Sequence, residues 1–175
     1  MGNDAHSAGE QVGTLPLPYT RLIHEKLSIV LTFAFSLPML RRILQTKFLG
    51  DWRYLRKTVD EIGSERAIQA FIDLAVYLRL LDDRTDHSGF LARVAQADAR
   101  NKPLDFGRVV KDGQPDERLY LRDLTNKVVH ATNWEWDFGD DDRPKLICIS
   151  NEPDRWTKAE IDILNFAAFC GGLVH

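Results

Sequence analysis

Five polar side chains in one short stretch have the types and spacing to do chemistry. Arg122, Asn126 and His130 recur at intervals of four, so a helix would hold them in a stripe that drifts slowly around its axis. Asp123 and Lys127 lie on the neighbouring stripe, in the acid-before-base order that stabilises a helix. An imidazole in such a setting could move a proton, and a guanidinium or ammonium group could offset the charge of a phosphate. The alternative, and the commoner case, is the solvated face of an amphipathic helix with a capping or packed histidine near its end.

This stretch also resembles a known sequence signature. The residues from Leu121 to Ala131, preceded by Phe106 to Gly113, resemble the pattern LR[ED]xxNK[IV][IV]HA of uncharacterised bacterial proteins that are similar to the HEPN superfamily of helical domains. Many members of that superfamily are dimeric, metal-independent endoribonucleases of toxin–antitoxin and phage-defence systems. The resemblance implies an RNA-acting domain in which Arg122 steadies a phosphate and His130 shuttles the proton of a ribose 2′-hydroxyl.

The spacing of the arginine and the histidine differs from that of the superfamily. Seven residues separate Arg122 from His130, where the superfamily has four to six. Within one helix the two groups would be about 80° apart around the axis and about 12 Å apart along it, too far to hold one phosphate together. A dimer could bring them together. A second hypothesis therefore stays open: a non-catalytic helical protein that serves interaction or assembly.

Charge and composition limit the choice of partner. The net charge of −3 disfavours a protein that binds nucleic acid through its overall charge, because phosphate neutralisation needs clustered Lys and Arg. Basic residues do cluster locally, at Arg41, Arg42, Lys47, Arg53, Arg56 and Lys57. This cluster could contact RNA or an acidic protein partner, although a solvated surface is the usual role of such residues.

No sequence motif indicates a cofactor or a metal. The chain has no glycine-rich phosphate loop, nucleophile elbow or dinucleotide fingerprint, and Cys148 and Cys170 do not form a CxxC pair. We expect two buried thiols, no cofactor and no metal. Met1 to Pro18 lacks the apolar core of a signal peptide, which favours a cytoplasmic protein.

The N-terminal third predicts a tail and a buried apolar element. Residues 1–18 are polar and rich in turn formers, and we expect a flexible tail there. Leu27 to Leu40 is the most apolar segment, but only 14 residues separate Lys26 from Arg41, too few to span a bilayer, so no membrane contact is expected. A buried helix is favoured over a buried strand, and the two remain open.

The middle of the chain predicts two helices, a short helix and a long loop. Leu49 to Gly63 has an apolar face, with Asp51 as N-cap and Gly63 as terminator, and a further helix should run from Ser64 to Asp82. A short helix is expected near residues 90–94. Residues 102–117 contain two prolines and two glycines, and we expect a long functional loop or a partly ordered linker there.

The C-terminal part predicts a hairpin followed by a helix. Alternation around Trp134 and Trp136 indicates a strand that packs its tryptophans on helices, within a β-hairpin at about 133–150. Thr157 and Glu160 form the pattern of a capping box for a strongly apolar last helix, a candidate surface for homodimerisation. The sequence thus predicts a mainly α protein, with residues 19–175 forming one bundle of four to six helices that carries a small antiparallel β-hairpin.

Overall fold

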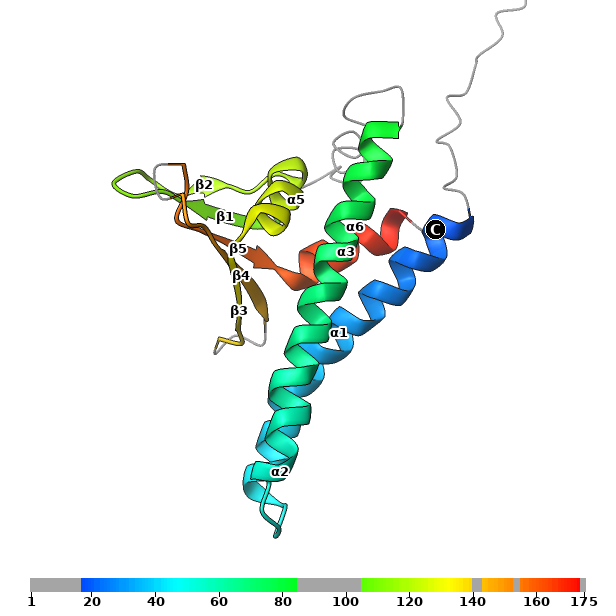
Figure 1. The fold of residues 1–175 in the computed structure, drawn as a ribbon, viewed down its shortest axis with the longest axis vertical. Coiled ribbons are helices and arrows are strands. Elements are labelled where there is room, and N and C mark those ends of the chain that lie inside the picture. The colour runs from blue at the N-terminus through cyan, green and yellow to red at the C-terminus, as the bar shows by residue number, and fades with distance from the viewer. Residues whose placement is uncertain (1–16, 85–104, 140–142, 153–154, 174–175) are drawn as a thin grey trace, which may run out of the picture.

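The computed structural model describes residues 17–84, 105–139, 143–152 and 155–173. The elements are, in chain order, α1 (Leu17–Thr46), α2 (Arg53–Arg56), the π-helical turn η1 (Lys57–Ile62), α3 (Gly63–Arg84), β1 (Gly107–Val110), β2 (Glu117–Arg118), α5 (Leu121–His130), β3 (Asn133–Asp137), β4 (Lys145–Ile149), β5 (Lys158–Asp162) and α6 (Ile163–Leu173). In Figure 1, α1 and α3 form a long antiparallel hairpin, and the strands with α5 lie beside its upper half.

The fold is mixed α/β, so the expectation of a helical bundle with one hairpin is wrong. Within the described residues, five strands form one antiparallel sheet in the order β2-β1-β5-β4-β3. β3 and β4 pair where a hairpin was expected, with Trp134 opposite Cys148 and Trp136 opposite Leu146. They are one edge of a larger sheet, because β5 and β1 extend it on the other side of β4.

The sequence pattern of β5 was misread as the start of a helix. Thr157 and Glu160 do not form a capping box: residues 158–162 are a strand, and the last helix begins only at Ile163. The Thr157 backbone N–H donates instead to the Val110 carbonyl oxygen at 2.9 Å, which extends the pairing with β1. Lys158, Glu160 and Asp162 alternate with apolar residues at the period of a strand, and this alternation was the available signal.

Gly107 explains why β1 forms within the segment that was expected to be a loop. Its φ of 125° lies in the region that favours glycine, and a Cβ there would lie 1.9 Å from the Glu160 carbonyl oxygen. Only a glycine therefore lets β1 approach β5 at this position. The partner strand lies about 50 residues further along the chain, so the local sequence carries no sign of the pairing.

The apolar segment 27–40 belongs to a single 30-residue helix, α1, which excludes a strand there. Pro38 is accommodated inside this helix. Gly63 does not end a helix as expected; its backbone is helical and continues into α3. A Cβ on Gly63 would meet the Phe33 ring at 3.0 Å, so the glycine serves the close packing of the hairpin.

Helix α1 is strongly apolar, yet only part of it is buried in the core. Its residues Tyr19–Thr46 are long and apolar enough to cross a membrane by length and composition, and only 28% of the most apolar window is buried. On its inner side Ile23, Val30 and Ala34 are almost fully buried in the core. The inner face of α1 therefore belongs to the fold, while much of its remaining apolar surface is exposed.

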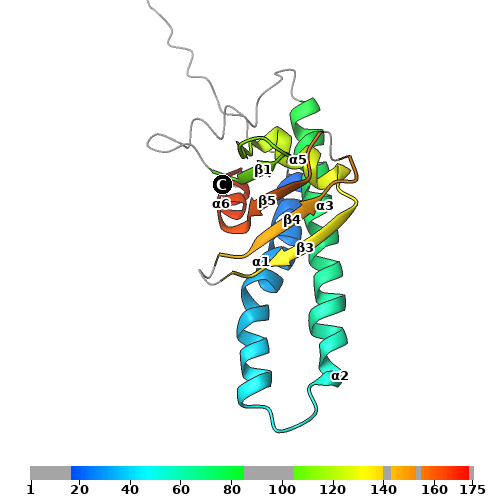
Figure 2. The ribbon, with the colours of Figure 1, turned by 90° about the vertical axis from the view of Figure 1, so that its left-hand side faces the viewer.

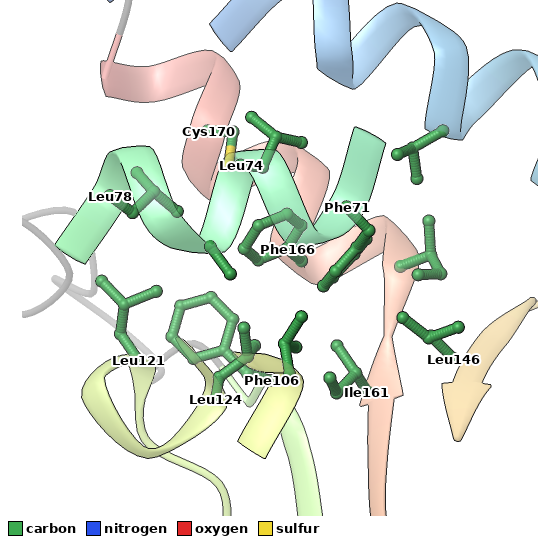
Figure 3. Packing of buried hydrophobic residues seen from close by; sticks show 14 of the residues in the cluster. Phe71, Leu74, Leu78, Phe106, Leu121, Leu124, Leu146, Ile161, Phe166 and Cys170 are labelled. Carbon is green, nitrogen blue, oxygen red and sulfur yellow. The ribbon is translucent and has the colours of Figure 1, made fainter. Parts of the chain in front are cut away.

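The core lies between the upper hairpin and the inner face of the sheet (Figure 3). Phe71 of α3 packs on Phe166 of α6 with ring centroids 4.6 Å apart, and Phe106 meets Phe169 edge-on at 5.5 Å. The buried side chains of α6, among them Ile163, Phe166 and Phe169, thus belong to the core of their own chain, while Leu164 of the same helix is exposed. Cys170 is fully buried in this core, and burial raises the pKa of its thiol above the ordinary value.

Several expectations fall outside the described residues. These are most of the N-terminal tail and the short helix near residues 90–94. α1 already begins at Leu17, inside the segment 1–18 that was expected to be a tail.

Candidate functional site on helix α5

Helix α5 carries the five candidate site residues, and its buried side sets their orientation. Leu121, Leu124, Thr125 and Val128 are buried, which turns the intervening polar positions toward α3 or toward solvent. The helix begins after Tyr120, whose backbone is extended and makes no side-chain cap, and it ends at Ala131, also extended. Packing against α3, rather than a capping side chain, therefore holds this short helix in place.

Arg122 binds two carboxylates at the C-terminal end of α3. Its Nη1 donates to Asp82 Oδ2 at 2.9 Å, and its Nη2 lies 3.7 Å from Asp83 Oδ1. The Asp82 side chain is only 10% exposed, whereas that of Arg122 is 62% exposed. The arginine that the resemblance assigns to a phosphate thus already has anionic partners in its own chain.

Asn126 makes the second polar bridge between the same two helices. Its Oδ1 accepts a hydrogen bond from Arg79 Nη1 at 2.9 Å, and the bond is partly buried. Arg79 lies three residues before Asp82 on α3, as Asn126 lies four residues after Arg122 on α5. Two members of the polar stripe therefore bind side by side along the α3–α5 contact.

Lys127 contacts a tryptophan ring. Its Nζ lies 4.8 Å from the centre of the Trp156 ring, a cation–π geometry. Partial burial lowers the pKa of this ammonium, the nearby Asp123 carboxylate opposes the shift, and Lys111 adds to it. The Trp156 ring is itself buried, so this contact lies at the edge of the core.

His130 and Asp123 are exposed on α5. Within the part of the chain that the structure describes, no other candidate residue forms a hydrogen bond or an ion pair with the His130 ring. His130 stands in the last turn of α5, two turns beyond Arg122, roughly 12 Å along the axis. The structure thus brings Arg122 and Asn126 together with α3 and leaves His130 apart from them. No acid–base pair is assembled from the five residues.

The sequence analysis did not identify Glu160, a buried carboxylate on β5. Glu160 Oε2 accepts from Arg108 Nε at 2.8 Å, and Lys158 Nζ lies 2.7 Å from Oε1. Burial alone would raise the pKa of Glu160, but the hydrogen bonds from Lys158 and Arg108 hold it below its usual value. Arg108 also reaches Asp116 at 3.1 Å, so the cluster is a paired network that joins β1 and β5.

The two tryptophans of β3 point inward, as their alternation predicted. The Trp136 ring lies 5.1 Å from that of Phe33 on α1, and Trp134 Nε1 donates to the Val128 carbonyl oxygen at 3.2 Å. Both rings therefore fix the sheet on the helices. They do not form an open platform on which bases could stack.

The described residues contain no group of side chains suited to a metal ion, and their two cysteines are buried. Among the described residues no three His, Cys, Asp or Glu side chains gather closely enough to hold a metal ion. Cys148 is a free, buried thiol whose pKa burial raises to about 12, far from the thiolate form that attacks electrophiles. Comparisons of the chain with protein-family models, with curated proteins and with solved structures find no match.

Proposed function

We propose that this chain is a non-catalytic interaction protein in which the polar stripe of α5 has a structural role. The observation that carries the proposal is the 2.9 Å contact between Arg122 Nη1 and Asp82 Oδ2. The charge of a guanidinium bound to a largely buried carboxylate is already partly offset, so it would stabilise a developing phosphate charge less than an unpaired arginine would.

The position of His130 supports the same proposal. A general acid or base must lie within hydrogen-bond reach of the proton that it transfers, and the cation that stabilises the reacting phosphate must contact that same phosphate. His130 is exposed, and eight residues along a helix separate it from Arg122. A substrate phosphate could not touch both groups of one chain at once. An RNA-acting HEPN-like role in defence or toxin–antitoxin systems stays a hypothesis, and it would need a second chain to complete the site.

The overall shape favours an interaction role. The sheet and α5 cover only the upper half of the α1–α3 hairpin, while the lower half projects beyond them (Figure 2). The projecting helices carry exposed apolar side chains, and a group of such side chains on a surface is typical of an interaction site.

An RNA-degradation assay tests the proposal against its rival. Wild type and His130→Ala are incubated with single-stranded RNA without added metal, and His175→Ala, which changes a histidine outside the stripe, serves as the control. We expect no turnover that distinguishes wild type from His130→Ala. RNA cleavage by wild type and by the control, lost in His130→Ala, would refute the non-catalytic role.

A further inference from the structure

The free end of the hairpin exposes large apolar side chains. We call residues 39–62, which contain the end of α1, the connecting loop, α2 and η1, the hairpin tip. Its exposed apolar side chains are Met39 (58% exposed), Leu40, Ile43, Phe48, Leu49 (103%), Tyr54 (83%), Leu55 and Ile62. Leu49 lies at the turn between the helices, where it touches almost nothing of its own chain. Soluble surfaces rarely gather so many apolar side chains without a partner.

The same tip is strongly basic in an acidic protein. Residues 39–62 contain six Lys or Arg and three acidic residues, a formal charge of +3, whereas the whole chain carries −3. The remainder of the chain therefore carries −6. Arg41 and Arg53 pair with Asp60 and Asp51, respectively.

Three of the tip's cations are free for an external partner. Arg42, Lys47 and Lys57 are exposed and form no ion pair within the described part of the chain. In the sequence they are interspersed with exposed apolar residues such as Ile43, Phe48 and Leu49. The tip thus presents both positive charge and apolar surface to whatever meets it.

We propose that the hairpin tip docks peripherally on an anionic lipid bilayer. Apolar and aromatic side chains would enter the headgroup and acyl boundary, and the free cations would face anionic headgroups. This inference rests on the proposed interaction function and names its partner. It also revises the expectation of no membrane contact, which considered only whether the apolar segment could span a bilayer.

Charge and side-chain type select this partner over two others. Nucleic acid would satisfy the cations, but it offers no medium for aliphatic groups such as Leu49, Met39 and Ile43. A two-fold interface between two tips would bring two patches of +3 together, which disfavours a second copy. An anionic bilayer satisfies both properties at once.

Docking at the tip leaves the fold intact. For α1 to cross a bilayer, Ile23, Val30 and Leu37 would have to leave the core, where they are 0–3% exposed. The connection between α1 and α2 lies at the end of the hairpin farthest from the sheet (Figure 1). Its exposed side chains Phe48 and Leu49 can therefore enter the lipid without rearrangement of the fold.

Vesicle flotation with full-length protein tests the proposal. Vesicles of phosphatidylcholine alone are compared with vesicles that contain 30 mol% phosphatidylglycerol, about the fraction that gives a strongly negative surface. We expect binding to the anionic vesicles that weakens with added salt, and much weaker binding to the neutral ones.

Two pairs of variants separate charge from apolar insertion. Lys47→Glu with Lys57→Glu should lower partitioning about 25-fold or more, while Arg21→Glu with Arg155→Glu, the same charge change far from the tip, should lower it much less. Leu49→Asp should lower partitioning about tenfold or more, and Leu164→Asp, at an exposed leucine of α6, should not. Circular dichroism and the thermal midpoint verify that each variant is folded.

Four results would overturn the proposal. They are absence of binding to anionic vesicles, binding that the tip variants leave unchanged, tip-dependent binding of single-stranded RNA in place of vesicles, and a dimer in sedimentation that Leu49→Asp dissociates. Failure here is distinguishable from failure of the proposed function, because RNA turnover is measured separately. A protein that neither binds vesicles nor cleaves RNA loses only the lipid partner.

Discussion

Replacing Arg122 with alanine removes the guanidinium that joins α5 to the end of α3. Arg122 Nη1 lies 2.9 Å from Asp82 Oδ2, in a pair whose carboxylate is 10% exposed and whose arginine is 62% exposed. A hydrogen bond to a charged group contributes about 1.5–3 kcal/mol when well shielded, and an exposed ion pair about 0.2–1 kcal/mol. With one partner shielded and the other open to water, we expect a coupling of about 1 kcal/mol.

A double-mutant cycle isolates this coupling. Unfolding free energies are measured by urea titration for wild type, Arg122→Ala, Asp82→Ala and the double variant. Arg122→Ala alone should cost about 1–2 kcal/mol, because its contact with Asp83 is lost as well. In a chain of this size, the thermal midpoint should fall by about 2–8 °C.

The exposed pair of Arg155 and Glu152 supplies the matched control. Its side chains are 79% and 59% exposed, so the same cycle should give a coupling below about 0.5 kcal/mol. A coupling at Arg122 and Asp82 no larger than that of the control would refute the structural role of the stripe. Full stability in Arg122→Ala would do the same.

Three further predictions concern the sheet and the core. Gly107→Ala should destabilise the protein by about 3 kcal/mol or more, because its Cβ would meet the Glu160 carbonyl oxygen, whereas Gly113→Ala, at φ 68° with nothing within 4 Å, should cost only about 1 kcal/mol by urea unfolding. Because the folded pKa of Glu160 lies below its ordinary 4.5, its stabilisation is present above pH 4.5 and lost as pH falls through the folded pKa. Glu160→Gln should therefore lower stability at pH 7 and flatten its decline in acid; an unchanged pH profile would contradict this. With its thiol pKa raised to about 12, Cys148 should resist iodoacetamide at pH 8 until urea unfolds the protein, and rapid labelling of the native chain would show the burial to be wrong.

The sequence predicted the elements whose signals are local. The apolar period that runs through α3 and α5 indicated those helices, and the alternation around Trp134 and Trp136 indicated β3. Both tryptophans pack on helices as expected, because a strand sends alternate side chains to the same face.

The elements that were missed depend on distant partners. β1 has four residues, too few for a periodic signal, and its stability comes from pairing with β5 about 50 residues away. Thr157, just before β5, and Glu160 within it have the spacing of a helix start, and the apolar residues of the adjoining α6 favoured the prediction of a helix. Gly63 looked like a helix terminator, yet its lack of a side chain serves the close approach of Phe33.

The stretch that carries the polar stripe was correctly predicted to be a helix, but the partners of its polar side chains could not be read from the sequence. Asp82 lies 40 residues before Arg122, and Arg79 lies 47 residues before Asn126. The sequence pattern of α5 is the same whether its polar side chains bind a substrate or bind a neighbouring helix. That distinction required the packing of α5 on α3.

The most direct test of the structural role of the stripe measures stability and RNA turnover on the same preparations of wild type and Arg122→Ala. We predict that the unfolding free energy of the variant falls by about 1–2 kcal/mol and that neither protein degrades RNA. Degradation by wild type that disappears in an equally stable Arg122→Ala would contradict the account and return Arg122 to a catalytic role.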